Sequence, residues 1–300
     1  MKIAILLTCY NRKSKTISCL NSVLQARDFY NRNNADILNL HFILTDDKCT
    51  DGTPEAVRQI LQYECHTIVQ ADGNAYWAGG MRLAWSQALS KGPFNFYLLL
   101  NDDTIMRENC FSELIDTHRY CLSHFTQGGV YTAFINDPDI EKVITYGAKK
   151  YTKGIFSSAV EMLPIGKPQK CTMPNANILL VSDNVCNQIG ILSEDYIHSA
   201  ADLDYGLRAV KAGCPVLTTS NICGSCKKDH DNADEEAKKV IPMSIKKRKE
   251  FLNRPTRQYK DSKTFFRKYS KIRYLLVCLS YYINIYAPTF YYMLLKLRGH

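Results

Sequence analysis

The 300-residue sequence lacks several features that would assign it to a common class of protein. Its first residues, MKIAILLTCY, lead straight into a strand-like segment, without the long apolar stretch and the small-residue cleavage site of a signal peptide. It contains no internal repeat and no low-complexity segment. We therefore expect a cytoplasmic globular protein whose twelve cysteines are reduced thiols rather than a disulfide framework.

Glycine is missing at a position where two classes of nucleotide-binding enzyme require it. The first predicted strand, 3–7, is followed by TCYNRKS. This segment does not contain the GxGxxG motif of a dinucleotide-dependent oxidoreductase. It also lacks the glycine-rich basic loop expected of a sugar nucleotidyltransferase. Both classes are therefore disfavoured, and the second is kept as an alternative.

The net charge of +9 comes from the C-terminal quarter of the chain. Of the 38 basic and 29 acidic residues, 18 and 7 lie from Lys227 onward, which leaves 20 and 22 before it. The sequence therefore predicts a near-neutral globular domain over 1–230 and a basic, tyrosine-rich helical tail over 231–300. A tail of this charge favours an anionic surface.

The tail contains an uncharged segment, 274–295, with basic residues on both sides. Its length could span a bilayer. However, one asparagine, one proline and six tyrosines make it weakly apolar, and tyrosine favours the level of the lipid headgroups. We therefore expect peripheral attachment to the inner face of the cell membrane, with a spanning helix and core packing as alternatives. Nucleic acid is not an expected partner.

Strand-like and helix-like segments alternate in the front half of the chain. Four short apolar runs are predicted strands: 3–7, 40–44, 67–69 and 96–100. Apolar residues at helical spacing lie between them. This alternation predicts an α/β fold with a mostly parallel, twisted sheet flanked by helices. In the second half we expect strands at 176–181 and 214–219 and a helix over 202–212.

Polar residues follow three of the predicted strands. They form the clusters Thr8–Arg12, Asp46–Asp47 and Asn101–Asp103. In parallel α/β sheets ligands bind beyond the carboxyl ends of the strands, so the three clusters are expected at one edge. This convergence is more informative than any single cluster.

The acidic pair Asp102 and Asp103 suits a divalent cation that carries phosphates. Such a cation prefers oxygen ligands, and a rigid strand fixes their position. We predict Asp103 as the ligand, while Asp102 would hold a ribose or the water shell of the ion. A turn or a helix cap is the alternative for the pair.

The other two strand ends could bind the rest of a nucleotide. Asp46 can accept a hydrogen bond from a base N–H, and its alternative is a capped turn. Thr8, Tyr10 and Arg12 could line the base or pair with phosphate.

The loop DGNAYWAGGMR, 72–82, is unusual for a connection between a strand and a helix. Two glycines before a helix would let backbone amides approach an anion, and Arg82 could reach a diphosphate. Plain packing is the alternative for Trp77. The candidate donor-binding residues of this loop are Asn74, Trp77, Gly79 and Arg82.

Two later segments supply further candidates. Asp202 and Asp204 lie two residues apart in a predicted helix, so at most one of them should face a cleft. Asp202 at the helix start could face an acceptor, although a cap is the alternative. Cys223 and Cys226 resemble half a zinc site that no second pair completes. His230 is instead a candidate ligand for the divalent ion.

In their order along the chain, these motifs resemble those of a family 2 glycosyltransferase with the GT-A fold. The matching segments are AILLTCYNR, TDDKCTDGT, LLLNDDT and ADLDYGLRAVKAG. DGNAYWAGGMR, NICGSC and the tail resemble a bacterial subgroup of that family. The resemblance covers essentially the whole chain, with a nucleotide-binding half over 1–105 and an acceptor-binding half over 106–230.

The resemblance implies inverting transfer of a sugar from a nucleotide donor to an acceptor hydroxyl, with Mn²⁺ or Mg²⁺ on the diphosphate. It places Asp103 on the metal and Asp202 as the catalytic base, and it assigns the base pocket to Thr8, Tyr10 and Asp46. His230 and Asn101 remain the candidates for a second metal ligand.

The expected donor is a UDP-sugar, with dTDP- and GDP-sugars as alternatives. The expected acceptor is a glycan or a lipid-linked saccharide in the synthesis of cell-surface polysaccharide or glycolipid. A non-catalytic membrane-surface protein that binds nucleotide sugars on a transferase scaffold remains the competing interpretation.

Overall fold

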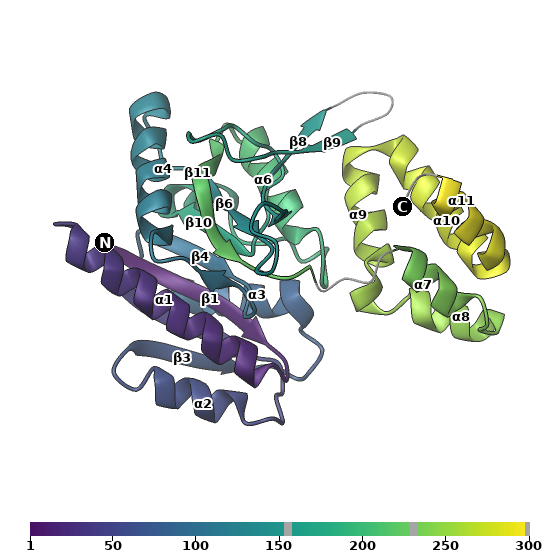
Figure 1. Ribbon diagram of the computed structural model, residues 1–300, viewed down its shortest axis with the longest axis horizontal. Coiled ribbons are helices and arrows are strands. Elements are labelled where there is room, and N and C mark those ends of the chain that lie inside the picture. Colours follow the sequence, from purple (N-terminus) through teal and green to yellow (C-terminus); the bar gives the residue numbers. More distant parts are fainter. Residues whose placement is uncertain (153–157, 229–232, 298–300) are drawn as a thin grey trace.

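The fold is described from a computed structural model and covers residues 1–152, 158–228 and 233–297 (Figure 1). The strands of its main sheet are β1 (Lys2–Cys9), β2 (Asn39–Asp46), β3 (Cys65–Gln70), β4 (Phe96–Leu100), β5 (Ile105–Met106), β6 (Val130–Asn136), β7 (Ile144–Tyr146), β10 (Ile178–Ser182) and β11 (Val216–Ser225). Their spatial order is β3-β2-β1-β4-β10-β6-β11-β5, with β7 beside β6. A separate pair is formed by β8 (Lys149–Thr152) and β9 (Ser158–Glu161).

The prediction of a mostly parallel sheet is confirmed, and so are the four predicted strands of the front half. The strands β1 to β4 lie next to one another and run in parallel. In the second half β10 lies antiparallel between β4 and β6. It therefore begins at the edge of the sheet where β4 ends, which brings the residues before β10 to the polar strand ends.

Helices cover both faces of the sheet. One face carries α1 (Lys13–Asn33), α2 (Thr53–Ile60) and α4 (Cys110–Phe125), and the other carries α3 (Tyr76–Lys91), α5 (Asp183–Ile189) and α6 (Ala201–Lys211). Successive residues of β1 point alternately into the two cores, because side chains alternate across a strand. This explains the continuous apolar run at 3–7.

The C-terminal part is helical, as expected (Figure 1). It contains α7 (Ala233–Val240), α8 (Ile245–Leu252), a 3₁₀ turn at Pro255–Arg257, α9 (Tyr259–Tyr269), α10 (Lys271–Tyr286) and α11 (Pro288–Leu297). The uncharged segment 274–295 is divided at Ala287, where α10 ends before a proline that cannot continue the hydrogen-bonding pattern. Among the described residues, no helix has both the length and the apolar character needed to cross a membrane.

Helix α9 differs from the rest of the tail, because it packs against the sheet domain. Phe265 is buried in the core on the α3–α6 face. The buried carboxylate of Asp261 accepts hydrogen bonds from three consecutive backbone amides, those of Ile197, His198 and Ser199, just before α6. Helix α9 thereby supports the loop from which α6 starts.

Candidate active site

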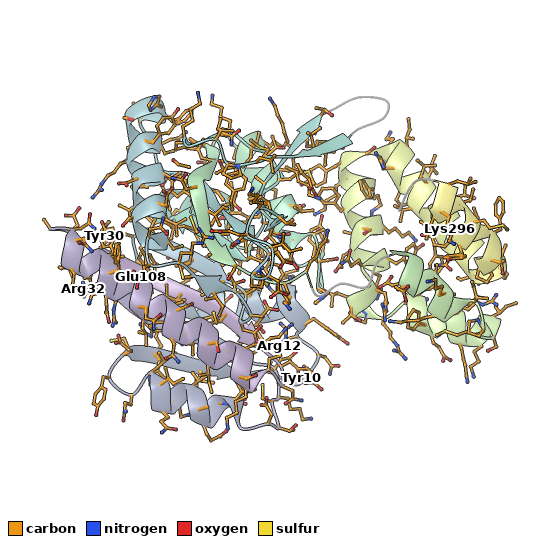
Figure 2. The ribbon with its side chains drawn as sticks, viewed as in Figure 1. Tyr10, Arg12, Tyr30, Arg32, Glu108 and Lys296 are labelled. Atoms are coloured by element: carbon orange, nitrogen blue, oxygen red, sulfur yellow. The ribbon has the colours of Figure 1, made fainter. Side chains whose placement is uncertain are left out.

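The acidic end of β4 is organised around one guanidinium group. Nη1 of Arg12 donates to Oδ1 of Asp102, and Nη2 lies beside Oδ2 of Asp103, both at 2.9 Å. Thr16 donates to the second oxygen of Asp102 at 3.1 Å. Both carboxylates are thus held by Arg12, which projects with Tyr10 from the β1–α1 connection, and by the first turn of α1 (Figure 2).

The two carboxylates differ in their surroundings. Asp102 is 4% exposed, and burial raises its pKa to about 6 although Arg12 acts in the opposite direction. Asp103 is more accessible and has Lys15 at 3.9 Å. Its Oδ1 faces the thiol of Cys226 at 3.7 Å, which is a weak donor. Asp103 therefore retains more capacity to bind a ligand than Asp102 does.

Asn101 serves as a structural link in this part of the site. Its Oδ1 accepts the indole N–H of Trp77 at 2.7 Å, and its amide donates to Oδ1 of Asn177 at 3.2 Å. The ring of Trp77 packs against the core on the α3 face. Trp77 thus packs against the core, and its indole hydrogen bond fixes the end of β4; its contact with a donor stays a prediction.

Asp46 and Asp47, at the end of β2, have separate roles. Asp46 accepts a hydrogen bond from the backbone amide of Cys49 at 2.7 Å, as in the capped-turn alternative. Asp47 accepts from the amides of Gly73, Ala75 and Tyr76 at 2.9 to 3.1 Å. Sequence reasoning gave Asp47 no role of its own, although its position beside Asp46 directly after a predicted strand was a usable signal.

The two glycines of the 72–82 loop lie inside α3, because the helix already begins at Tyr76. A Cβ on Gly80 would lie 2.1 Å from Oγ1 of Thr8, so glycine is required for α3 to approach β1. Thr45 donates to the carbonyl of Gly80 at 2.8 Å. Gly80 therefore allows close packing between α3 and the sheet. The expectation that the two glycines precede the helix, in an anion-binding loop, is wrong because both lie within α3.

Arg82 is held by the segment before α6. Its guanidinium donates to the carbonyls of Ser193 and Tyr196 at 2.9 and 2.8 Å. With Gly79 and Asp72 it lines a cavity of about 420 Å³ beside the start of α3. Burial lowers the pKa of Arg82 from its ordinary value.

Asp202 lies in the first turn of α6 and is 9% exposed. Its carboxylate accepts hydrogen bonds from the amides of Ala176 and Leu203 at 3.1 and 2.9 Å. Burial is the main cause that raises the pKa of Asp202, and the backbone donors oppose it. Glycine at position 206 allows α6 to approach Pro174 closely. A Cβ at this position would lie 2.0 Å from Cδ of Pro174.

Asp204 points to the other side of α6. It is fully buried and accepts from Tyr196, Arg208, Lys268 and Tyr269. Asp202 and Asp204 thus contact different partners, as two residues at this spacing on a helix should; that Asp202 faces a cleft stays a prediction.

A short segment joins Asp202 to the acidic end of β4. Asp202 accepts from the amide of Ala176, and the carbonyl of the next residue, Asn177, accepts from the amide of Asn101 at 3.1 Å. Because β10 is antiparallel to β4, this segment lies at the edge where β4 ends. The carboxylates at the end of β4 and at the start of α6 are thus positioned by one hydrogen-bonded unit.

The model of glycosyl transferase family 2 matches residues 4–173. The chain belongs to this family. It is a glycosyltransferase with a GT-A-type fold, as the resemblance of its motifs implied. The matched region includes the strand ends and the acidic pair, whereas Asp202 lies beyond it.

Solved structures agree with this fold. The glycosyltransferase resembles residues 1–349 of TarS from S. aureus in complex with UDP-GlcNAc, with 14% identity, a TM-score of 0.55, and coverage of 95% of this chain and 82% of that chain. A mannosyltransferase from Pyrobaculum calidifontis, in complex with GDP-Man and Mn²⁺, gives 12% identity, a TM-score of 0.53, and coverage of 99% and 79%. At these identities the likeness shows the fold alone. No curated protein matches the sequence.

In this glycosyltransferase the predicted donor-binding residues fall into two groups. Residues of the first group lie at the strand ends and at the start of α3 against them: Thr8, Tyr10, Arg12, Asp46, Trp77 and Asp102. The second group comprises the other candidates of the 72–82 segment: Asn74 in the loop before α3, and Gly79 and Arg82, which line the cavity beside that helix. His230, the second candidate metal ligand, lies outside the described residues, and the amide of Asn101, the other candidate, is engaged by Trp77 and Asn177.

Proposed function

We propose that this glycosyltransferase transfers a sugar from a nucleoside diphosphate donor to an acceptor hydroxyl, with inversion at the anomeric carbon. The observation that carries the proposal is the unit formed by Asp202, Ala176–Asn177 and Asn101. It holds a buried carboxylate on α6 in a fixed relation to the acidic end of β4. A donor site and a base are the two parts that such a reaction requires.

The strand ends are suited to the nucleotide. Tyr10 is 57% exposed at the end of β1, where its ring can lie against a base. Asp46 at the neighbouring strand end supplies a carboxylate to a base N–H. The TarS structures with UDP and UDP-GlcNAc and the mannosyltransferase with GDP-Man support a nucleotide-sugar donor, and we favour a UDP-sugar.

The residues at the end of β4 fit a divalent cation, Mn²⁺ or Mg²⁺. Asp102 and Asp103 offer the oxygen ligands that these ions prefer, and Oδ1 of Asp103 faces only a weak thiol donor among its hydrogen-bond partners in the described residues. We propose Asp103 as the ligand, with His230 as a candidate second ligand. When bound, the cation would neutralise charge on the departing diphosphate.

Asp202 is the proposed catalytic base. Burial raises the pKa of its carboxyl, so its carboxylate is a stronger base than an exposed aspartate. One carboxylate that takes the acceptor proton fits a single displacement, which inverts the anomeric configuration. The two backbone donors fix its orientation.

The first experiment screens nucleotide sugars for thermal stabilisation of the full chain with and without Mn²⁺. We expect a cation-dependent increase in Tm with one nucleoside diphosphate sugar, and Asp103→Ala should abolish it. Product formed with that donor is then analysed by proton NMR for anomeric configuration. A retained configuration would contradict inversion, and binding without transfer to any glycan acceptor would favour the non-catalytic interpretation.

We further propose that α10 and α11 attach the enzyme to the inner face of the cell membrane, where it would act on a glycan or a lipid-linked saccharide. One side of α10 exposes Leu275, Leu279, Tyr282 and Tyr286, which are 56 to 64% exposed and recur at helical spacing. Helix α11 exposes Phe290, Met293 and Leu297. The exposed cations Lys271, Arg273 and Lys296 flank these side chains and favour anionic lipid.

Co-sedimentation with vesicles tests this attachment. We expect binding to vesicles that contain phosphatidylglycerol, weaker binding to pure phosphatidylcholine, and weakening at high salt. The double variant Leu275→Glu/Leu279→Glu should lose binding. The control Leu89→Glu makes the same type of substitution at a 47% exposed leucine of α3 and should not. Equal sedimentation of both variants would refute the attachment.

A further inference from the structure

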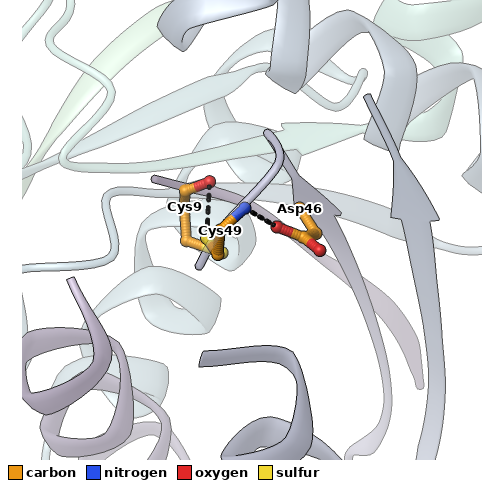
Figure 3. Close-up of side chains that lie close together, drawn as sticks. All are labelled: Cys9, Asp46 and Cys49. Atoms are coloured by element: carbon orange, nitrogen blue, oxygen red, sulfur yellow. Dashed lines mark hydrogen bonds between the residues drawn. The ribbon is translucent and has the colours of Figure 1, made fainter. Parts of the chain in front are cut away.

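Two thiols and a carboxylate lie together where β1 and β2 end. Cys9 and Asp46 are the last residues of these parallel strands and are paired in register. The loop after β2 turns back, so that Sγ of Cys49 lies 3.7 Å from Sγ of Cys9 (Figure 3). The two sulfur atoms and a carboxylate oxygen of Asp46 all lie within 4.8 Å of one another.

The spacing of the sulfur atoms is that of a tetrahedral metal site. Zn²⁺ binds thiolate sulfur at about 2.3 Å, and a tetrahedral angle then separates two sulfur ligands by about 3.8 Å. The observed separation is 3.7 Å. A disulfide would require a sulfur–sulfur distance of about 2.05 Å, so the two side chains would have to move for that bond to form.

The loop holds this arrangement by backbone contacts. The amide of Cys49 donates to Asp46 at 2.7 Å, and the amide of Asn11 donates to Sγ of Cys49 at 3.3 Å. A donor directed at sulfur favours the thiolate that a metal requires. Cys9 is buried whereas Cys49 is partly exposed, which gives an ion a route from solvent.

Ions of the zinc class bind cysteine as the thiolate, and ordinary thiols are largely protonated at neutral pH because their pKa is about 8.5. Binding of an ion to both sulfurs therefore releases about two protons, one from each thiol.

We propose that Cys9, Asp46 and Cys49 form a binding site for a thiophilic divalent cation of the zinc class, and that the bound ion competes with the nucleotide. The site differs from the one at Asp103 by its ligand chemistry, because sulfur ligands select zinc-like ions and carboxylates select Mg²⁺ and Mn²⁺. The competition rests on the proposed function, in which Asp46 and Tyr10 hold the base. An ion on Asp46 removes the carboxylate that the base N–H would use.

The binding step is tested on the reduced full-length chain with Cd²⁺ and Zn²⁺ as probes. Cd²⁺ should give the ultraviolet band of thiolate-to-cadmium charge transfer, and Zn²⁺ in weak buffer should release about two protons per ion bound. Cys49→Ser should weaken binding about 100-fold or more, because a ligand is lost. Cys65→Ser, at an exposed cysteine of β3 outside the cluster, should leave it unchanged.

Because Cys9 is buried, the circular dichroism and Tm of Cys9→Ser are measured first to show that this variant folds. Cys49→Ala is a second variant at the more accessible cysteine. A band and a proton release that persist in Cys49→Ser and Cys49→Ala would overturn the site. The absence of any thiolate band in the wild-type chain would overturn it as well.

The competition is measured separately, by calorimetric titration of UDP with Mn²⁺ present, before and after loading with Zn²⁺. We expect UDP affinity to fall at least tenfold in the loaded wild type and to stay unchanged in Cys49→Ser. Equal affinity in loaded and unloaded wild type would overturn the competition. A chain that binds Zn²⁺ through Cys49 but binds no nucleotide would overturn the proposed donor pocket and leave the metal site established.

Discussion

Two regions of the molecule each bury aspartate carboxylates, and they differ in how these groups are satisfied. At the end of β4, Asp102 and Asp103 share the single guanidinium of Arg12. At the junction of α6 and α9, Asp204 alone accepts from two hydroxyls and two cationic side chains. Asp261, from α9, accepts from three backbone amides.

The difference indicates which carboxylates are available for chemistry. A buried carboxylate surrounded by donors on all sides is fixed, and its removal leaves donors without partners. Asp103 has an oxygen that faces only a weak donor among the described residues, and Asp202 has two backbone donors. We therefore propose structural roles for Asp204 and Asp261 and chemical roles for Asp103 and Asp202, and this proposal can be tested within one helix.

The largest effect is expected for Asp202→Asn. The amide cannot take the acceptor proton, so the transfer rate should fall by about 10² to 10⁴. Donor binding, measured by calorimetry, should change little because the side-chain shape is kept. The Tm should fall slightly, because the amide oxygen can accept from only one of the two backbone donors that the carboxylate satisfies. Transfer at the wild-type rate would refute the assignment of Asp202 as the base.

Asp204→Asn, two residues along the same helix, should show the opposite pattern. The partly exposed cations Arg208 and Lys268 would lose their shared anion, and the hydrogen bonds to the fully buried carboxylate would weaken, which costs about 3 kcal/mol of unfolding free energy. Urea denaturation measures this loss. The transfer rate per folded molecule should stay near that of the wild type, and a selective loss of kcat without loss of stability would break the distinction between the two regions.

A smaller loss, about 2 kcal/mol, is expected for Asp261→Asn. The neutral oxygen can still accept, but hydrogen bonds to a charged acceptor are stronger than those to a neutral one. The loop at 197–199 should become more accessible to proteolysis in this variant. The control Asp36→Asn removes an exposed aspartate and should change neither quantity.

Much of the fold follows from local patterns in the sequence. The continuous apolar runs become β1 to β4, and the polar clusters after them meet at one edge because parallel strands end together. The position of β10 could not be predicted from such patterns. Its place between β4 and β6 depends on pairing between residues distant in the chain.

The partners of the site residues were harder to predict than the residues themselves. Arg12 was expected to line the base or pair with phosphate, and its partners in the structure, Asp102 and Asp103, lie about 90 residues away in the sequence. The composition of the tail also concealed the difference between α9, which packs on the domain, and α10, which exposes an apolar side. Both features arise from tertiary contacts that leave no periodic signal.

The smallest expected effect is the pH dependence of stability that Asp202 contributes. Burial raises its pKa in the folded chain above the ordinary 3.8, so the folded state binds the proton more readily than the unfolded state. The resulting stabilisation is complete below the ordinary pKa and is lost as pH rises through the folded pKa. Relative to Asp202→Asn, the wild type should therefore lose stability between pH 4 and neutrality.

The comparison of Tm for these two proteins across that range isolates Asp202, because every other titrating group, including Asp102, is common to both. Each unit of pKa difference corresponds to about 1.4 kcal/mol, so the expected change is modest. A Tm difference that stays constant with pH would mean that the pKa of Asp202 in the folded chain is that of an exposed aspartate. The argument that burial makes Asp202 a stronger base would then fail.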